Sequence, residues 1–199
     1  MKNYLETFFL GILAALGSLV VVATFETLLT INTFPDANST SVLFLPKFII
    51  LAVIIEEFFK FILLRKRMVI FSGRMSLLMG GVFLGLGFSA IEILFLLFRN
   101  VILVEIMSNI YNLAILHILT SAILGYFLSI FQKKLAILAI LPPVALHLIF
   151  NLTSSKGISA VPALLISSLL FLLFILVKDV LLGRFAFGKI IFYNKDGKR

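Results

Sequence analysis

Long apolar runs dominate this sequence and restrict the folds that it can adopt. A helix rises about 1.5 Å per residue, so about 20 apolar residues are enough to cross a hydrocarbon layer of roughly 30 Å. Six runs reach or approach this length, and their approximate ranges are 8–30, 42–64, 75–98, 109–131, 135–152 and 159–182. We therefore predict an all-α fold, a polytopic transmembrane helical bundle of about six spans.

The composition agrees with a membrane-embedded chain and excludes several kinds of site. Hydrophobic residues make up 62% of the 199 residues and charged residues 13%, whereas a soluble domain is about half apolar and a quarter charged. Because the chain has no cysteine, disulfides, thiolate metal sites and cysteine nucleophiles are excluded. The first run is too long for the core of a signal peptide, so we expect it to be retained. No linker or internal repeat is visible, and residues 1–199 are expected to form a single transmembrane domain.

The basic residues predict how the helices are oriented in the membrane. Of the 17 Lys and Arg residues, 13 fall on the side of the two termini, and one, Lys60, lies inside the second run. The other three fall on the opposite side: Lys47, Arg99 and Lys156. Lys and Arg are enriched in cytoplasmic loops, so both termini are predicted to be cytoplasmic. The formal net charge of +8 is thereby assigned to membrane topology. The expected partner is the lipid bilayer, and no nucleic acid is expected.

The second run contains a charged cluster that is unusual for a membrane interior. Glu56, Glu57 and Lys60 lie within the apolar segment LAVIIEEFFKFILL, residues 51–64. An isolated charge at the centre of a transmembrane helix costs roughly 2.5 to 3.5 kcal/mol. Glu56 and Lys60 are four residues apart, so they share a helical face and are expected to neutralise each other in part. Such a cluster indicates a functional site, and the alternative is an ion pair that only fixes helix packing.

Three further runs carry polar residues at similar depths. The third run has Glu92, the fourth has His117 and Ser121, and the fifth has His147 and Asn151. His117 and Ser121 are four residues apart, as are His147 and Asn151, so each pair lies on one helical face. Counted at about 1.5 Å per residue, Glu92 and the two histidines lie between the midplane and the extracytoplasmic face. A single histidine or serine usually bonds a neighbouring helix, but this set predicts one shared layer.

The third run also has a stripe of small residues. Gly81, Gly85 and Ser89 recur every four residues, a spacing that lets another helix approach closely. Glu92 follows Ser89 on nearly the same face, so the stripe is expected to bring Glu92 against the helix that packs there. Gly80 and Gly87 lie off the stripe and are expected to be merely permissive.

Four segments, in order, resemble the four motifs of the PrsW family of intramembrane proteases: EEFFK at 56–60, FSAIE at 88–92, HILTS at 117–121 and HLIFN at 147–151. The related CAAX prenyl proteases and bacterial Abi proteins have an Arg one residue after the position of Lys60. Their second motif ends in His, where this chain has Glu92. The resemblance covers four of the six predicted spans and places a catalytic core at about 42–152.

The resemblance implies an intramembrane endopeptidase whose substrates are membrane-bound proteins, with anti-sigma factors as the example. It implies that Glu56, paired with Glu57, activates a water together with His117 or His147. It also implies that Asn151 donates a hydrogen bond to the developing oxyanion. The expected supporting residues are Lys60, Glu92 and Ser121.

Metal dependence is an alternative that the sequence leaves open. Two histidines and a carboxylate are one of the ligand sets that keep a zinc position free for water. The expected donors for a divalent metal such as zinc are His117, His147 and Glu92, which lie in three different runs. A glutamate that activates water without a metal is the other possibility.

Three other functions compete with this interpretation. A protease of the CAAX or Abi type would act from the cytoplasmic side, whereas the depths above predict cleavage in or near the extracytoplasmic half. A proton-coupled transporter would use the same residues as a proton relay and would show a helix broken at the midplane or two similar halves. A membrane protein could also use the cluster to bind a partner without turnover. For the protease, the expected location is the cell membrane.

Overall fold

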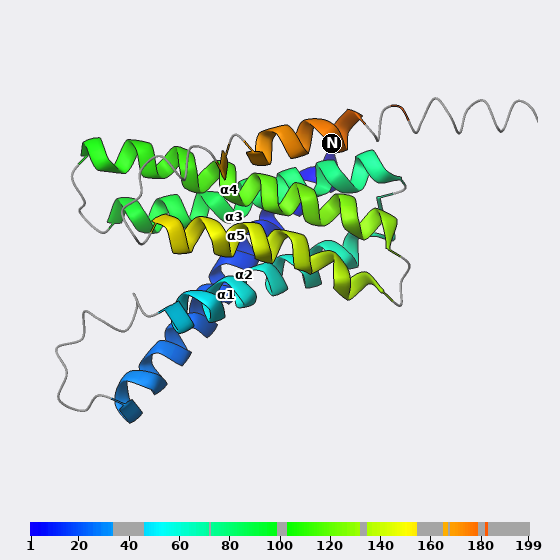
Figure 1. The fold of residues 1–199 in the computed structure, drawn as a ribbon. Helices are drawn as coiled ribbons and strands as arrows, with labels where there is room; N and C mark the ends of the chain where they lie inside the picture. Colours follow the sequence, from blue (N-terminus) through cyan, green and yellow to red (C-terminus); the bar gives the residue numbers. More distant parts are fainter. Residues whose placement is uncertain are drawn as a thin grey trace, which may run out of the picture.

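The computed structural model describes residues 1–33, 46–71, 73–98, 103–131, 135–154, 165–166, 168–178 and 182. These residues form helices and no strand, which confirms the predicted all-α bundle (Figure 1). In chain order the helices are α1 (Lys2–Thr33), α2 (Pro46–Arg67), α3 (Arg74–Phe98), α4 (Leu103–Ile130), the 3₁₀ helix η2 (Ala136–Ile140) and α5 (Leu141–Ser154). A shorter apolar helix follows at Ser168–Lys178.

The described part of the chain has four helical segments that are long and apolar enough to cross a membrane: Lys2–Leu28, Arg74–Phe98, Ile110–Ile130 and Ala136–Ser154. α2 has 22 residues and is also long enough, but Glu56, Glu57 and Lys60 interrupt its apolar sequence. The chain is therefore an integral, multi-pass membrane protein. The sixth predicted run, 159–182, lies partly outside the described residues, so the count of six spans stays a prediction.

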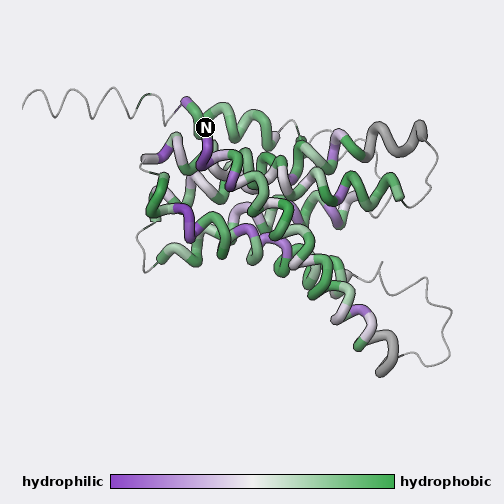
Figure 2. The backbone as a smooth tube through the Cα atoms, turned by 180° about the vertical axis from the view of Figure 1, so that it is seen from behind, coloured by the Kyte–Doolittle hydropathy of each residue, from purple (hydrophilic) through white to green (hydrophobic). Residues whose placement is uncertain are grey.

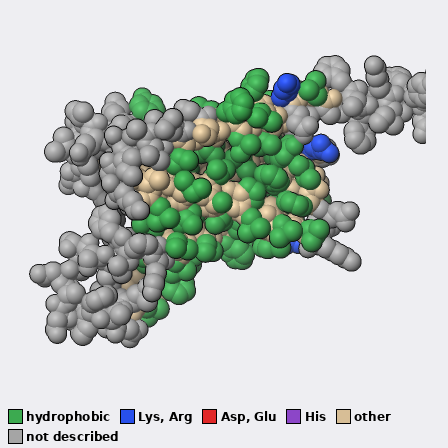
Figure 3. All heavy atoms as spheres, viewed as in Figure 1, with side chains coloured by type: hydrophobic (Ala, Val, Ile, Leu, Met, Phe, Trp, Pro, Cys, Tyr) green, Lys and Arg blue, Asp and Glu red, His purple; other side chains and the backbone are tan. Residues whose placement is uncertain are grey.

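Apolar side chains cover the outside of the bundle, as a lipid-facing surface requires. Phe9, Val20 and Phe98 are 55%, 64% and 73% exposed, and most of each helix is hydrophobic (Figure 2). The face in Figure 3 is mostly hydrophobic too, and its Lys and Arg side chains lie at the end of the bundle where the N-terminus is found. This distribution suits a cytoplasmic N-terminus, which stays a prediction.

Glycines let α3 pack directly on α4. A side chain at Gly81 would collide with the backbone carbonyl of Ser121, and one at Gly85 would collide with the carbonyl of His117. Small residues that allow two backbones to approach are a common device in transmembrane helix pairs. The stripe predicted from the sequence is therefore a real helix contact, and it sets the position of His117 relative to α3.

Other glycines bring α1 against α3. Gly11 of α1 meets the carbonyl of Leu84, and Gly87 of α3 meets the carbonyl of Phe8. We predicted that Gly80 and Gly87 would be merely permissive, and this is wrong. A side chain at Gly87 would collide with the α1 backbone, and one at Gly80 would collide with the ring of Phe71. α3 is therefore in contact with both α1 and α4, and it is the helix on which both are positioned.

α1 crosses the bundle obliquely and separates from α3 beyond the crossing (Figures 1 and 2). Its contact with α2 includes Gly17, which faces the ring of Phe59. Beyond this contact, Val20, Phe25 and Leu28 are 64%, 44% and 51% exposed. The second half of α1 therefore diverges from the rest of the bundle and leaves α3 less covered on that side.

α5 begins with two prolines and is then regular. Pro142 and Pro143 lie in its first turn, where the backbone N–H groups would have no helical partner in any case. The prolines mark the change from the 3₁₀ helix η2 to α5 and leave the turns around His147 intact. The transporter alternative predicts a helix broken at the midplane, and the described helices show no such break.

Candidate functional site

The charged cluster of α2 is buried inside the bundle. The side chains of Glu57 and Lys60 are 0% exposed, and that of Glu56 is 18% exposed. Lys60 Nζ donates a hydrogen bond to Glu57 Oε1 at 2.7 Å. We expected Lys60 and Glu56 to neutralise each other in part, but the direct ion pair of Lys60 is formed with Glu57. Residues three apart also share a helical face, and Glu57 faces the interior together with Lys60, whereas Glu56 borders α1.

His117 of α4 joins this pair and connects it to α3. Lys60 Nζ lies 2.8 Å from His117 Nδ1, and Glu92 Oε2 contacts the other ring nitrogen, Nε2. Gly85 packs on the backbone of His117, so Glu92, about two turns further along α3, reaches the same ring. This confirms the prediction that the glycine stripe brings Glu92 against a neighbouring helix.

His147 of α5 completes the cluster. Its Nδ1 atom lies 2.8 Å from Glu57 Oε1, and its Nε2 atom lies 3.6 Å from Glu56 Oε2. The two imidazole rings stand edge to face, with centroids 5.0 Å apart and an interplanar angle of 81°. The predicted shared layer is therefore present, and it consists of Glu56, Glu57, Lys60, Glu92, His117 and His147.

The two histidines are held in the same way. Each places Nδ1 against the Lys60–Glu57 pair and directs Nε2 at one of the two remaining carboxylates, Glu56 or Glu92. The ring of Phe88 closes the apolar side of the cluster. Its centroid lies 4.8 Å from that of the His117 ring and 4.3 Å from Lys60 Nζ. The buried pair therefore orients both rings, and Glu56 and Glu92 form the outer part of the cluster.

Hydrogen-bond chemistry indicates where the ring protons lie. An ionised carboxylate only accepts, so Nδ1 of His147 carries the proton that it donates to Glu57, and its Nε2 has a free lone pair. Lys60 as an ammonium only donates, so Nδ1 of His117 accepts, and the ring proton lies on Nε2, towards Glu92. The two histidines thus present different groups to the outer carboxylates, a lone pair in one case and an N–H in the other.

The cluster offers a donor set for a divalent metal. One ligand atom each from Glu56, His117 and His147 lies within 4.8 Å of the others. Two histidines with a carboxylate suit an open zinc site, and a histidine that binds metal through Nε2 usually donates Nδ1–H to a group such as the Glu57 carboxylate. For His117 to bind a metal through Nε2, its ring proton must lie on Nδ1, and Lys60 must then be a neutral amine that accepts this hydrogen bond, because an ammonium only donates. The residues therefore fit a metal such as zinc, with Glu56 next to the histidines where the sequence suggested Glu92.

Two predicted site residues lie at the edge of this cluster. Ser121 is fully buried one turn after His117, and its Oγ atom has no hydrogen-bond partner among the described residues. Asn151 lies one turn after His147 on α5 and is half-buried. The spacing places each on the face of its helix that carries the histidine, and their catalytic roles stay predictions.

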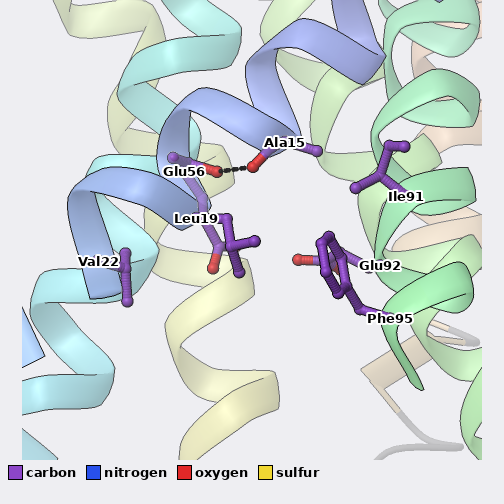
Figure 4. A pocket seen from close by; sticks show the side chains of 8 residues that line it. Ala15, Leu19, Val22, Glu56, Ile91, Glu92 and Phe95 are labelled. Atoms are coloured by element: carbon purple, nitrogen blue, oxygen red, sulfur yellow. Dashed lines mark hydrogen bonds between the residues drawn. The ribbon is translucent and has the colours of Figure 1, made fainter. Parts of the chain in front are cut away.

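A small pocket of about 50 Å³ lies beside the two outer carboxylates. Glu56 and Glu92 contribute to its lining, and α1 contributes Ala15, Leu19 and Val22 (Figure 4). The sequence did not point to α1 as part of the site. Apolar residues in an apolar run give no signal that distinguishes a pocket wall from a lipid-facing surface.

A model of a known protein family matches most of the chain. The family is described as PrsW family intramembrane metalloprotease, and the match covers residues 1–178. It includes α1 and the helix Ser168–Lys178 in addition to the four segments on which the resemblance rested. No curated protein and no solved structure matches the chain.

Proposed function

The chain belongs to the PrsW family of intramembrane metalloproteases, and we propose that it hydrolyses membrane-bound proteins at the cluster formed by Glu56, Glu92, His117 and His147. As a member of this family it is a peptidase of the membrane, and its helices make it a multi-pass membrane protein. The proposed substrates are proteins of the anti-sigma-factor type, and the proposed location is the cell membrane.

The arrangement around the two histidines carries this proposal. Their Nδ1 atoms contact the buried Lys60–Glu57 pair, while their Nε2 atoms face Glu56 and Glu92 beside a pocket. Buried polar groups that only fix helix packing are expected to satisfy one another without adjoining space. The outer carboxylates of this cluster instead border a pocket, as groups that meet a substrate must.

Glu56 is proposed as the general base. Its carboxylate borders the pocket, and its Oε2 atom lies 3.6 Å from His147 Nε2, which is too far for a strong hydrogen bond. The carboxylate takes a proton from a water while the water oxygen adds to the carbonyl carbon of the substrate. The C–N bond then breaks, and the protonated carboxyl group gives the proton to the leaving amine nitrogen.

The other residues of the cluster hold groups in place or stabilise charge. Glu57 and Lys60 contact the two Nδ1 atoms at 2.8 Å each and are proposed to keep both rings in a fixed orientation. The side-chain amide of Asn151 is proposed to donate to the oxyanion, where one such donor typically contributes a factor of about a hundred to a thousand in rate.

His117, His147 and one outer carboxylate would hold a divalent metal. When bound, a metal such as zinc polarises the substrate carbonyl and makes an adjacent water more acidic. One carboxylate is then the third ligand, and the other is free to move the proton. The three donor atoms that lie within 4.8 Å of one another include Glu56, whereas Glu92 contacts His117 Nε2. We keep the metal-binding role predicted from the sequence for Glu92 and assign proton transfer to Glu56, and the amide variants below decide between this assignment and its exchange.

Substitution of each outer carboxylate by its amide separates these two roles. The purified variants are placed in liposomes with a membrane-anchored substrate protein, cleavage is followed on gels, and bound zinc is measured by elemental analysis. Glu56→Gln is expected to abolish cleavage and keep the zinc, because the amide keeps the shape and loses the base. Glu92→Gln is expected to lose zinc and cleavage together.

The control is Glu6→Gln, the same chemical change outside the cluster. Glu6 pairs with Arg67 at 2.8 Å, and its side chain is 42% exposed, so the variant is expected to keep both zinc and activity. Cleavage by Glu56→Gln at the parent rate would refute the assignment of the base. Loss of zinc in Glu56→Gln and retention in Glu92→Gln would exchange the two roles.

The depth of the cluster supports cleavage in the extracytoplasmic half of the membrane. With a cytoplasmic N-terminus, α3 runs outward, and Glu92 lies about 27 Å from Arg74 at its start. The pocket beside Glu92 lies between α1 and α3, and the second half of α1 diverges from α3 (Figure 1). Water and substrate would therefore reach the cluster from the outer half.

A further inference from the structure

We propose that the pocket beside Glu56 and Glu92 receives one small apolar side chain of the substrate, next to the bond that is cut, and that Leu19 and Val22 of α1 set its size. This inference rests on the proposed function, because it takes the two carboxylates as the groups nearest the scissile bond. α1 then determines which peptide bonds are cleaved, although none of its residues takes part in the chemistry.

The walls of the pocket match an apolar side chain. Apart from the carboxylates, the lining consists of Ala15, Ser18, Leu19 and Val22 of α1 and two apolar side chains of α3. The hydroxyl of Ser18 donates to the carbonyl of Ala15 at 3.0 Å. This hydroxyl proton is therefore not directed at a ligand, and the α1 wall is effectively apolar.

The size of the pocket restricts what it can hold. A cavity of about 150 Å³ accommodates a benzene ring, so a pocket a third as large holds about two non-hydrogen atoms. The volume of about 50 Å³ therefore suits the side chain of Ala or Ser. Leu and Phe side chains are too large unless the walls move.

The pocket opens towards lipid at the side chains of Leu19 and Phe95. Leu19 and Phe95 both line it and are 43% and 41% exposed, and exposed apolar side chains of a membrane protein face lipid. A transmembrane segment of a substrate can therefore arrive laterally between α1 and α3. We favour such a segment over a lipid chain because the N–H groups of a locally unwound peptide can donate to Glu56 and Glu92, which an acyl chain cannot do.

Thiol labelling measures the size of the pocket without requiring activity. The chain has no cysteine, so Ser18→Cys introduces a single thiol in the pocket wall. Methyl and benzyl methanethiosulfonate are compared, and the intrinsic difference between them is taken from Val20→Cys, which is 64% exposed on the same helix. After this correction the benzyl reagent is expected to react at least about ten times more slowly with Ser18→Cys.

A second substitution tests whether α1 sets this size. Adding Leu19→Ala to Ser18→Cys is expected to restore benzyl labelling about tenfold. Leu13→Ala is the matched control, because Leu13 lies on α1, is 59% exposed and does not line the pocket. Equal labelling by both reagents in Ser18→Cys, or no effect of Leu19→Ala, would overturn the inference.

The occupant is identified by protection of the same thiol. A synthetic polyleucine helix with a central Ala-Ala pair is expected to slow methyl labelling, and a polyleucine helix without the pair is not. Protection that depends only on the acyl chains of the liposome would assign the pocket to lipid and refute the inference. Fastest labelling by a charged, water-soluble reagent would make it a water channel and refute it too.

Cleavage of graded peptides then connects the pocket to specificity. Transmembrane peptides with one variable central residue, Ala, Val, Leu or Phe, are offered to the parent protein and to Leu19→Ala, and the cut bonds are mapped by mass spectrometry. The parent is expected to prefer Ala at least about tenfold over Leu, and Leu19→Ala to reduce this preference. Cleavage without any size preference contradicts the inference and leaves the proposed function intact. If labelling is as expected but no peptide is cleaved, the proposed function is contradicted, and the measured size of the pocket still holds.

Discussion

Lys60→Met is expected to destabilise the protein by about 3 to 5 kcal/mol, although Met is more apolar and similar in length. Lys60 is fully buried, donates to Glu57 Oε1 at 2.7 Å and lies 2.8 Å from His117 Nδ1. Its removal leaves the Glu57 carboxylate buried, with His147 as its remaining partner among the described residues. An uncompensated buried charge is the reason for the large expected loss.

The double variant Lys60→Met/Glu57→Gln is expected to recover most of this stability. Gln keeps the shape of the Glu57 side chain and removes the charge that Lys60 compensates. Replacing both members of a buried ion pair by neutral groups is often close to neutral, so the two substitutions should show a coupling free energy of about 2 to 3 kcal/mol. Cleavage should stay low in the double variant, because nothing then holds His117 Nδ1.

The assay is the free energy of unfolding, measured by denaturant titration in mixed micelles with the helical circular dichroism signal. Arg67→Met is the matched control. Arg67 forms an ion pair with Glu6 at 2.8 Å, close to the Lys60–Glu57 distance, but its side chain is 13% exposed and that of Glu6 is 42% exposed. Loss of this partly exposed pair is expected to reduce stability by about 1 kcal/mol. Equal losses for Lys60→Met and Arg67→Met would refute the reasoning.

Three further predictions address the packing, the oxyanion and the side of cleavage. Gly85→Ala should lower the free energy of unfolding by about 1 to 3 kcal/mol and reduce cleavage, because its methyl group would collide with the carbonyl of His117; unchanged stability and activity would show that this close contact is not needed. Asn151→Ala should lower turnover roughly a hundredfold with substrate affinity little changed, and a change in affinity alone would make it a substrate contact. Ile93→Cys, beside Glu92, should react with a membrane-impermeant thiol reagent added outside, and reaction from the cytoplasmic side alone would favour the CAAX-type alternative.

The helices and the depth of the polar residues follow from the sequence alone. Both depend on local properties, because apolar length determines where a span begins and ends, and the rise per residue places Glu92, His117 and His147 at similar heights. The glycine stripe was also visible, since the spacing of Gly81 and Gly85 indicates a close contact whatever helix supplies it.

Only the tertiary structure decided which side chains meet. The sequence suggested that Lys60 and Glu56 would neutralise each other in part, but the rotation of α2 in the bundle turns Lys60 and Glu57 inward and leaves Glu56 beside α1. The contribution of α1 was invisible for a similar reason, because Leu19 looks like any lipid-facing leucine until the crossing of α1 over α3 is known. Helix rotation and crossing depend on contacts between residues far apart in the chain, which a pattern within one helix does not record.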